Sequence, residues 1–246
     1  MSTPDRRVTP EILDDLPPED PRAMRARRDL RRVHFAMRSV TVLDAAVARL
    51  GLQEPPRRIL ELGAGDGTLL LRYAGQLKPS WPEVELTLLD RNDLVSPQTR
   101  AAYAAHGWRV TVLETDVHAW AAGHGATRYD LCVANLFLHH FEPPALLTLF
   151  RAIARSCDAL VACEPRRSRL AQLGSRLVVF LGANSVTRED AVKSVDAGFQ
   201  GEELSLLWRR ALAAAHAGQS MVPTWTLEEY AALPFTHCFT ARRAAA

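Results

Sequence analysis

Apolar residues follow two alternating patterns along the chain from residue 57 onward. Short apolar runs with the composition of buried strands alternate with segments in which apolar residues recur at steps of three and four, the spacing of a helix face. The predicted strands cover residues 57–62, 84–89, 108–113, 129–134 and 159–163, and the predicted helices cover residues 68–77, 97–105 and 144–154. Such alternation predicts a doubly wound α/β fold, in which a mostly parallel sheet has helices on both faces.

The C-terminal part of the chain is predicted to complete this sheet. A helix is expected over residues 202–215, followed by a strand pair over residues 225–230 and 236–241 that supplies an antiparallel C-terminal strand. The first strand of the pair has a competing interpretation, because Thr226 and Glu229 have the spacing of a helix capping box.

The N-terminal part divides into an arm and a helical cap. Residues 1–20 contain four prolines and several acids, which favours a flexible arm. From Leu30 to Leu50, apolar residues recur at helical spacing on one stripe, and Gly51 is expected to end the helix. We therefore predict a cap over residues 21–52 and one main domain over residues 53–246.

The alternation lapses between residues 165 and 200, which we interpret as a lid inserted after the fifth strand. This stretch contains an apolar run at residues 177–181 followed by the polar turn of residues 182–185. The run could be a membrane-surface helix, but its shortness and the lack of a basic polar face favour a buried lid helix.

Charge and cysteine content restrict the class of protein. The 246 residues contain 30 Lys and Arg against 28 Asp and Glu, and the resulting formal charge of +2 is too small to imply nucleic acid or an anionic membrane as a partner. Seven of the arginines, however, fall between Arg22 and Arg38, and this run is the one local feature that indicates a polyanionic partner, although a solvated helix face is the favoured interpretation. The four cysteines form no CxxC pair and indicate reduced core thiols. Without an apolar run long enough for a membrane span or a secretory signal, a cytoplasmic protein is expected.

A glycine-rich turn follows the first predicted strand. Glu61 precedes three glycines at alternate positions, Gly63, Gly65 and Gly67, with a helix directly after them. Glycine allows positive φ and leaves the backbone bare for a ligand, and the helix start offers N–H groups to a carboxylate. A nicotinamide loop would instead have G-x-G-x-x-G spacing.

Residues 57 to about 165 resemble the class I S-adenosylmethionine-dependent methyltransferases, whose first motif is acid-x-G-x-G-x-G. The resemblance implies a Rossmann-like fold, with Asp90 at the end of the second strand accepting the ribose hydroxyls. It places Asp116 at the adenine amino group and the N–H of Val117 beside it. The residues that it further assigns to the S-adenosylmethionine site are Ala64, Arg91 and Asn135. Acids at successive strand ends fit ligand binding at the carboxyl edge of the sheet.

The segment after the fourth strand, residues 135–141, contains His139 and His140. The resemblance places this segment near the transferred methyl group, where a histidine could take a proton from a phenol-like acceptor near neutral pH. Adjacent side chains diverge, so we expect only one of the two to face the site and favour His139. The alternative is that both histidines stand at the start of a helix with their hydrogen bonds satisfied by the protein. No metal site is expected.

The segment at residues 135–138 lacks the Asn/Asp-Pro-Pro-aromatic pattern of adenine and amide N-methyltransferases. We therefore expect a small-molecule oxygen or carbon acceptor that is phenolic, quinone-like or polyketide-derived. Glu164, Arg166 and Arg167 could contact it, or the arginines could pair with Glu189 and Asp190 in the lid. Two alternatives stay open for the function: an RNA methyltransferase that uses the arginine-rich helix, and a catalytically silent S-adenosylmethionine-binding module. A homodimer also stays open.

Overall fold

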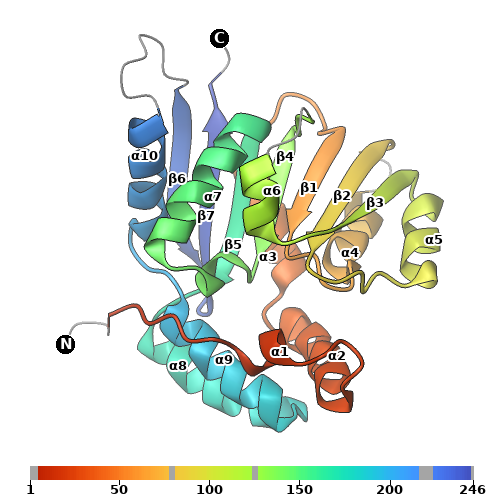
Figure 1. Ribbon diagram of the computed structural model, residues 1–246, viewed down its shortest axis with the longest axis vertical. Helices are drawn as coiled ribbons and strands as arrows, with labels where there is room; N and C mark the ends of the chain where they lie inside the picture. The colour runs from red at the N-terminus through yellow and green to blue at the C-terminus, as the bar shows by residue number, and fades with distance from the viewer. Residues whose placement is uncertain (1–4, 78–80, 124–126, 216–223, 245–246) are drawn as a thin grey trace.

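A computed structural model describes residues 5–77, 81–123, 127–215 and 224–244 of the chain. Its centre is a seven-stranded sheet in the order β3-β2-β1-β4-β5-β7-β6 (Figure 1). The strands are β1 (Arg58–Leu62), β2 (Val84–Asp90), β3 (Trp108–Glu114), β4 (Leu131–Asn135), β5 (Ala159–Pro165), β6 (Trp225–Ala232) and β7 (Thr236–Arg243). The pairs among β1 to β5 are parallel, whereas β7 is antiparallel to both of its neighbours. The predicted doubly wound, Rossmann-like sheet with an antiparallel C-terminal strand is confirmed.

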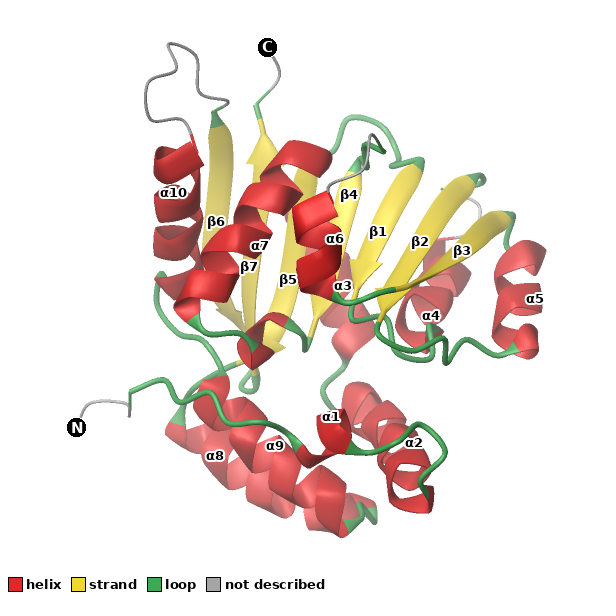
Figure 2. Ribbon diagram, viewed as in Figure 1, coloured by secondary structure: helices red, strands yellow, loops and turns green. Residues whose placement is uncertain are grey.

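Helices cover both faces of the sheet (Figure 2). One face packs against α3 (Ser39–Arg49), α4 (Thr68–Leu77) and α5 (Pro97–Ala105), and the other against α6 (Val117–Gly123), α7 (Pro143–Ser156) and α10 (Glu203–Ala215). Side chains alternate along each strand between these two cores: Ile59 faces the first and Leu60 the second. The continuous burial of β4 and β5 matches their apolar sequences.

The helical stripe from Leu30 to Leu50 belongs to two helices rather than one. The first is α2 (Pro21–Ala36), and the chain then turns at Met37 and Arg38 before α3 begins. Arg38 has a φ of 55°, a left-handed conformation that no continuous helix contains. The apolar spacing continues across this break because both helices bury one side, but α3 packs on the sheet while α2 joins the cap.

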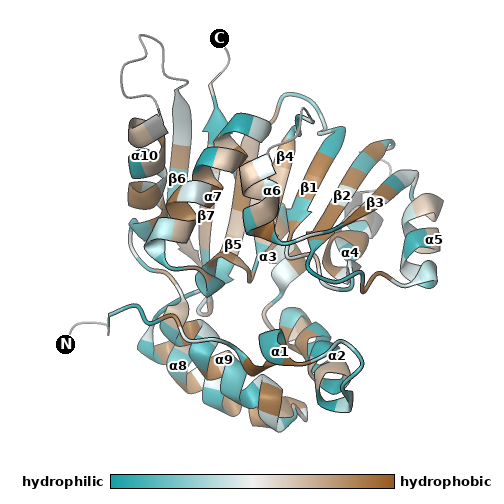
Figure 3. Ribbon diagram, viewed as in Figure 1, coloured by the Kyte–Doolittle hydropathy of each residue, from teal (hydrophilic) through white to brown (hydrophobic). Residues whose placement is uncertain are grey.

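The cap lies below the carboxyl ends of the parallel strands (Figure 1). It contains α1 (Ile12–Asp15), α2, α8 (Arg169–Arg176), the 3-10 helix η2 (Leu177–Leu181) and α9 (Ser185–Ala197). The helices α8, η2 and α9 come from the insertion after β5. The cap therefore combines N-terminal helices with helices that are far away in the sequence. Residue hydropathy is mixed in these helices, whereas hydrophobic residues dominate the centre of the sheet (Figure 3).

The prediction of a buried lid helix at residues 177–181 is wrong. Of the five residues of η2, only Val178 is buried, and Phe180 is 82% exposed. The segment follows an amphipathic helix whose apolar side also faces outward, as described below. An apolar run in sequence does not by itself say which surface covers it.

The capping-box interpretation of Thr226 and Glu229 is wrong, because both residues lie in β6. Glu229 nevertheless caps a helix that is distant in sequence. Its carboxylate accepts hydrogen bonds from the backbone N–H groups of Leu204 (3.0 Å) and Ser205 (2.7 Å) at the start of α10. His237 Nε2 lies 2.8 Å from the same carboxylate.

All four cysteines are buried and free. Cys163 and Cys238 face each other across β5 and β7, with their sulfur atoms 3.7 Å apart. Within the described ranges, no helix combines the length and the hydropathy that a membrane crossing requires.

Candidate functional site

The turn after β1 shows why three glycines stand at alternate positions. Gly63, Gly65 and Gly67 all have positive φ, at 66°, 55° and 70°. A Cβ atom at Gly63 would lie 2.2 Å from the ring of Phe137, and one at Gly67 would lie 2.9 Å from Leu88. A Cβ atom at Gly65 would meet no protein atom within 4 Å. Packing therefore requires two of the glycines, while Gly65 leaves bare backbone beside open space.

The turn is anchored from the neighbouring helix α5. Tyr103 is fully buried, and its hydroxyl group donates a 2.6 Å hydrogen bond to the carbonyl oxygen of Gly67. We expect Tyr103→Phe to lower the free energy of unfolding by about 1 kcal/mol, the net value of one such bond. Urea denaturation of the two proteins measures the difference. Equal midpoints and slopes would show that the bond adds nothing to stability.

Asp90 is placed at the end of β2 and faces the same turn. Its Oδ2 accepts a 2.9 Å hydrogen bond from the N–H of Gly65, and its Oδ1 accepts one of 3.2 Å from Asn92. Asp66 lies inside the turn, where it caps the start of α4 through the N–H of Thr68 (3.1 Å) and pairs with Arg31 at 3.3 Å. No motif predicts the Asp66–Arg31 pair, although an aspartate just before a helix is a common capping residue.

A cavity of about 510 Å³ lies between this turn and the helical cap. Most of the predicted site residues line it: Glu61, Gly63, Ala64, Gly65, Asp90, Arg91, Asn135, His139 and His140. Gly67, Asp116 and Val117 do not line it. Much of the apolar lining comes from the cap and the turn after α2, with Leu30, Val33, Met37, Leu177, Val178 and Leu181 among its members.

Two buried polar groups in the cavity wall have no hydrogen-bond partner among the described residues. These are Oε2 of Glu61, a residue that is 3% exposed, and Nδ2 of Asn135. Complete burial raises the pKa of Glu61 well above its usual value, and the negative charges of Asp66 and Asp90 add to this. Unpaired buried groups of this kind are costly, so they indicate a polar ligand. The amino-acid end of S-adenosylmethionine, with its ammonium and carboxylate groups, fits them and the bare Gly65 backbone.

Asp116 lies at the same edge of the sheet but is exposed. Its Oδ1 accepts a 2.7 Å hydrogen bond from the N–H of His118 at the start of α6, and Val117 is buried in the second core. The adenine contact of Asp116 therefore stays a prediction, because helix capping accounts for its position here.

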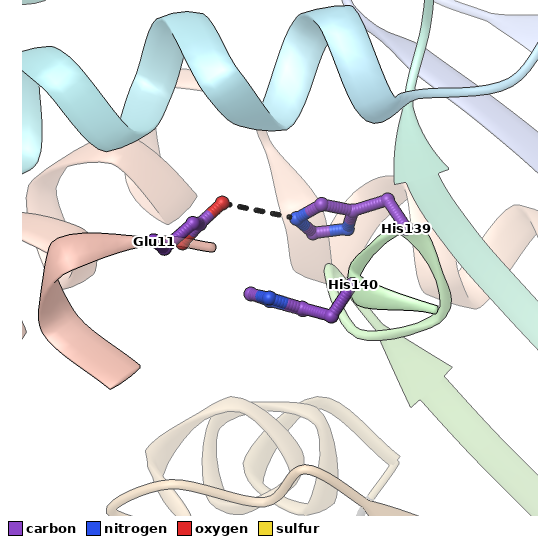
Figure 4. Close-up of side chains that lie close together, drawn as sticks. All are labelled: Glu11, His139 and His140. Atoms are coloured by element: carbon purple, nitrogen blue, oxygen red, sulfur yellow. Dashed lines mark ion pairs between the residues drawn. The ribbon is translucent and has the colours of Figure 1, made fainter. Parts of the chain in front are cut away.

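His139 is held between two carboxylates. Its Nδ1 lies 2.8 Å from Oε2 of Glu164, and its Nε2 lies 3.4 Å from Oε1 of Glu11 (Figure 4). Burial by itself would lower the pKa of His139, but the hydrogen bonds and charges of Glu11 and Glu164 outweigh it and raise the pKa to about 9. His139 therefore carries a positive charge at neutral pH when only these residues surround it, so accepting a proton would require this charge to be lost first.

His140 lies beside His139, with the two ring centres 4.3 Å apart. Its Nδ1 is 3.2 Å from Asp14, whose other oxygen pairs with Arg91 at 2.9 Å. Both histidines line the cavity, so the expectation that only one would face it is wrong. The 3-10 turn Leu138–His140 brings both rings to one side.

The N-terminal arm supplies carboxylates that the sequence analysis assigned no role. Arg6 donates hydrogen bonds to the carbonyl oxygens of Ala197 (2.7 Å) and His139 (3.0 Å), and Asp190 accepts the N–H groups at Ile12 (2.8 Å) and Leu13. These contacts place Glu11 and Asp14 at the cavity. They join residues more than 120 positions apart, so no local pattern could reveal them.

The acids and arginines around the fifth strand pair differently from the prediction. Arg167 is buried and binds Glu203 and the carbonyl oxygen of Gly198, rather than Glu189 or Asp190. Glu189 pairs with Lys193 at 3.0 Å. Glu164 is fully buried and accepts hydrogen bonds from the backbone N–H groups of Phe137 (3.2 Å) and Leu138 (2.9 Å), which shapes the histidine turn.

Comparisons with known proteins address the family. Residues 59–159 match the model of a methyltransferase domain. A search of curated proteins finds no match. The solved structure of the plantazolicin methyltransferase BpumL in complex with SAH is similar, with a TM-score of 0.61, 14% identity and 92% of each chain covered. So is magnesium protoporphyrin IX methyltransferase from Synechocystis PCC 6803 with bound SAM, with a TM-score of 0.52, 14% identity, and 89% of this chain and 84% of that chain covered.

An O-methyltransferase family protein from Burkholderia thailandensis is a third similar structure, with a TM-score of 0.57, 18% identity, and 92% of this chain and 61% of that chain covered. The domain match covers the glycine turn, Asp90 and the histidine pair, and the fold that these structures share is the sheet described above. Residues 59–159 thus match a methyltransferase domain, and the chain has the fold of solved methyltransferases that were crystallised with S-adenosylmethionine or its product.

Proposed function

We propose that the acceptor is a small molecule of phenolic, quinone-like or polyketide-derived character, methylated on oxygen or carbon. The observation that carries this proposal is the composition of the cavity wall. Leu30 and Val33 of α2 and Met37 directly after it give it an apolar side, while Glu11, His139 and His140 form a polar end. Such a wall suits a ligand with an apolar body and a few polar atoms.

The cofactor supplies a methyl group that is already activated by its sulfonium centre. The residues proposed to hold it are Glu61, the Gly63 to Gly67 turn, Asp90 and Asn135, which leaves the cap side of the cavity for the acceptor. The protein then has to align the acceptor and exclude water. A base is needed only for a weakly acidic acceptor. The proposed proton acceptors are His140 and, once it has lost its own charge, His139.

The RNA alternative receives less support from the arginine-rich helix. Five of its seven arginines make contacts inside the protein: Arg22 with Asp20, Arg27 with the carbonyl oxygen of Pro18, Arg28 with that of Met24, Arg31 with Asp66 and Arg32 with Asp29. The names of the structural neighbours above also favour a small acceptor. Salt-sensitive retention of RNA would instead favour the alternative, since phosphate contacts release counterions.

Transfer of labelled methyl groups tests the proposal. The protein is incubated with labelled S-adenosylmethionine and a panel of phenols, hydroquinones and aromatic polyketides, with total RNA as a separate arm. We expect label in one or more small molecules and none in RNA. Label in RNA alone would overturn the proposal, and SAH binding without transfer to any arm or to cell extract would indicate the silent module.

Separate replacement of the histidines then tests the base. We expect His139→Gln or His140→Gln to reduce transfer to a phenolic acceptor by about 100-fold or more, the usual contribution of general acid–base catalysis. Transfer that neither replacement affects would remove the base assignment and leave the methyltransferase assignment intact. SAH binding, measured by calorimetry in each variant, shows whether the cofactor site has survived.

A further inference from the structure

We propose that Glu11, His139 and His140 bind a divalent transition-metal ion at the polar end of the cavity. One nitrogen of each ring and one oxygen of Glu11 lie within 4.8 Å of one another (Figure 4). Two histidines and one carboxylate are a donor set that zinc and iron(II) use in proteins. The proposal concerns ion binding and does not depend on the identity of the acceptor.

The distance between the first two ligands fits such an ion. His139 Nε2 and Glu11 Oε1 are 3.4 Å apart. Metal–ligand bonds of about 2.0 to 2.2 Å place neighbouring ligands of a tetrahedral zinc roughly 3.3 to 3.5 Å apart. His139 Nε2 is also buried and points at Glu11, and apart from that carboxylate it has no polar partner among the described residues.

Each of the three ligands is held by a second polar group. Nδ1 of His139 contacts Glu164, Nδ1 of His140 contacts Asp14, and the hydroxyl group of Ser194 donates to Oε1 of Glu11. Metal-binding histidines almost always have such a carboxylate or carbonyl partner on the other ring nitrogen, which fixes the tautomer and the ring orientation. An ion pair between Glu11 and His139 alone would not account for the matching arrangement around His140.

Charge around the cluster favours a cation. Four carboxylates surround it, from the start of α1, from β5 and from α9, namely Glu11, Asp14, Glu164 and Asp190. The nearby cationic side chains among the described residues are three: Arg6, Arg91 and Lys193. With three protein ligands, an ion keeps a position for water or an acceptor oxygen. An acceptor hydroxyl bound there would lose its proton more readily, which is the task otherwise given to a base.

Titration of the metal-free protein with Zn²⁺ tests the site, and Co²⁺ absorption reports the ligand geometry. We expect one ion per chain and a tetrahedral Co²⁺ spectrum. Glu11→Gln, His139→Ala and His140→Ala should each weaken binding by at least about 100-fold, because outer partners alone contribute 10- to 100-fold. His118→Ala is the matched control, since His118 is an exposed histidine outside the cluster.

Thermal unfolding of each variant identifies replacements that disturb the fold, and Glu164→Gln gives a further variant that keeps all three ligands. It should weaken Zn²⁺ binding by about 10-fold or more. Absence of stoichiometric Zn²⁺ in the parent protein would overturn the proposal, as would equal affinity in the three ligand variants and His118→Ala. The cluster would then be an ion pair that holds the arm.

A second inference rests on the outer face of the cap. In α8, the large apolar side chains Leu170 and Leu173 are each 56% exposed, whereas the buried positions hold Ala171 and Ser175. The exposed apolar face continues into η2, where Phe180 is 82% exposed. We infer that this face, defined by residues 170–181, docks on an anionic membrane surface.

Charge supports a lipid surface as the partner. Arg169 and Arg176 flank the exposed leucines of α8, are exposed, and have no ion-pair partner among the described residues. The sequence contains no acidic residue from position 166 to position 188. A short helix with apolar and basic side chains outward is the form that interfacial helices take. The inner side of the same segment lines the cavity, so an acceptor carried in the membrane would have a short path to it.

Flotation with lipid vesicles tests this surface. The protein should float with vesicles of phosphatidylcholine and phosphatidylglycerol in roughly equal parts, and less with phosphatidylcholine alone. Leu173→Ser and Phe180→Ser should each weaken binding by about 10-fold or more, as expected from the loss of one buried apolar side chain. Leu206→Ser is the matched control, because Leu206 is 54% exposed on α10 outside the face. Absence of flotation, or a dimer in solution that Phe180→Ser dissociates without any vesicle binding, would overturn the inference.

Discussion

Replacement of Asp90 by alanine is expected to weaken the binding of S-adenosylhomocysteine by about 10- to 150-fold. The carboxylate faces the cavity at the end of β2, where the ribose contact is predicted, and hydrogen bonds to a charged group contribute about 1.5 to 3 kcal/mol. Asp90 also accepts the N–H of Gly65, so its loss would loosen the turn that receives the cofactor. Calorimetric titration measures the affinity of both proteins.

Glu114→Ala is the matched control for Asp90. Glu114 is the residue directly opposite Asp90 in the β2–β3 pair, but it is exposed and does not line the cavity. We expect its replacement to leave the affinity unchanged. An affinity in Asp90→Ala equal to that of the control would contradict the ribose assignment. Asp116→Ala in the same titration shows whether the predicted adenine contact exists.

The sequence predicted the sheet because its strands carry their own evidence. The runs that form β1, β4 and β5 are mostly apolar, and polar residues or glycines stand where these strands end, namely Glu61 and Gly63 at β1, Asn135 at β4 and Glu164 at β5. The cofactor side of the cavity shares this property, since Glu61, the glycines and Asp90 stand at strand ends. For these residues, the local sequence pattern is therefore enough to predict the position in the fold.

The acceptor side could not be predicted in the same way. Glu11 approaches His139 only because Arg6 and Asp190 hold the arm across α9 and the histidine turn. The break at Arg38 and the exposed face of α8 and η2 likewise depend on tertiary packing, because helical spacing continues through both segments. The cap therefore determines what the cavity admits, and its residues carry little signal in a single sequence.

Alanine at Gly63 should mainly lower the stability of the fold, whereas alanine at Gly65 should mainly weaken ligand binding, although the two glycines differ little in φ. At Gly63, the left-handed conformation costs about 1 to 3 kcal/mol, and a clash at 2.2 Å with the Phe137 ring adds about 1 to 3 kcal/mol. We expect Gly63→Ala to lower the free energy of unfolding by about 2 to 6 kcal/mol. Chemical denaturation measures this loss.

At Gly65, only the backbone cost of about 1 to 3 kcal/mol applies, because a Cβ atom meets no protein atom within 4 Å. Gly65→Ala should therefore fold but bind S-adenosylhomocysteine at least about 10-fold more weakly, since the added methyl group occupies space that the ligand approaches. A Gly65→Ala protein with full affinity would mean that the cofactor does not lie against this turn.

Phe137→Ala separates the two costs at Gly63. In a double-mutant cycle, Gly63→Ala should be less destabilising when Phe137 is already alanine, because the ring that clashes is gone and only the backbone cost remains. Additive effects would place the entire cost in the backbone conformation. The requirement for glycine at position 63 would then come from φ alone, and the contact with the histidine-bearing segment would not limit which residue stands there.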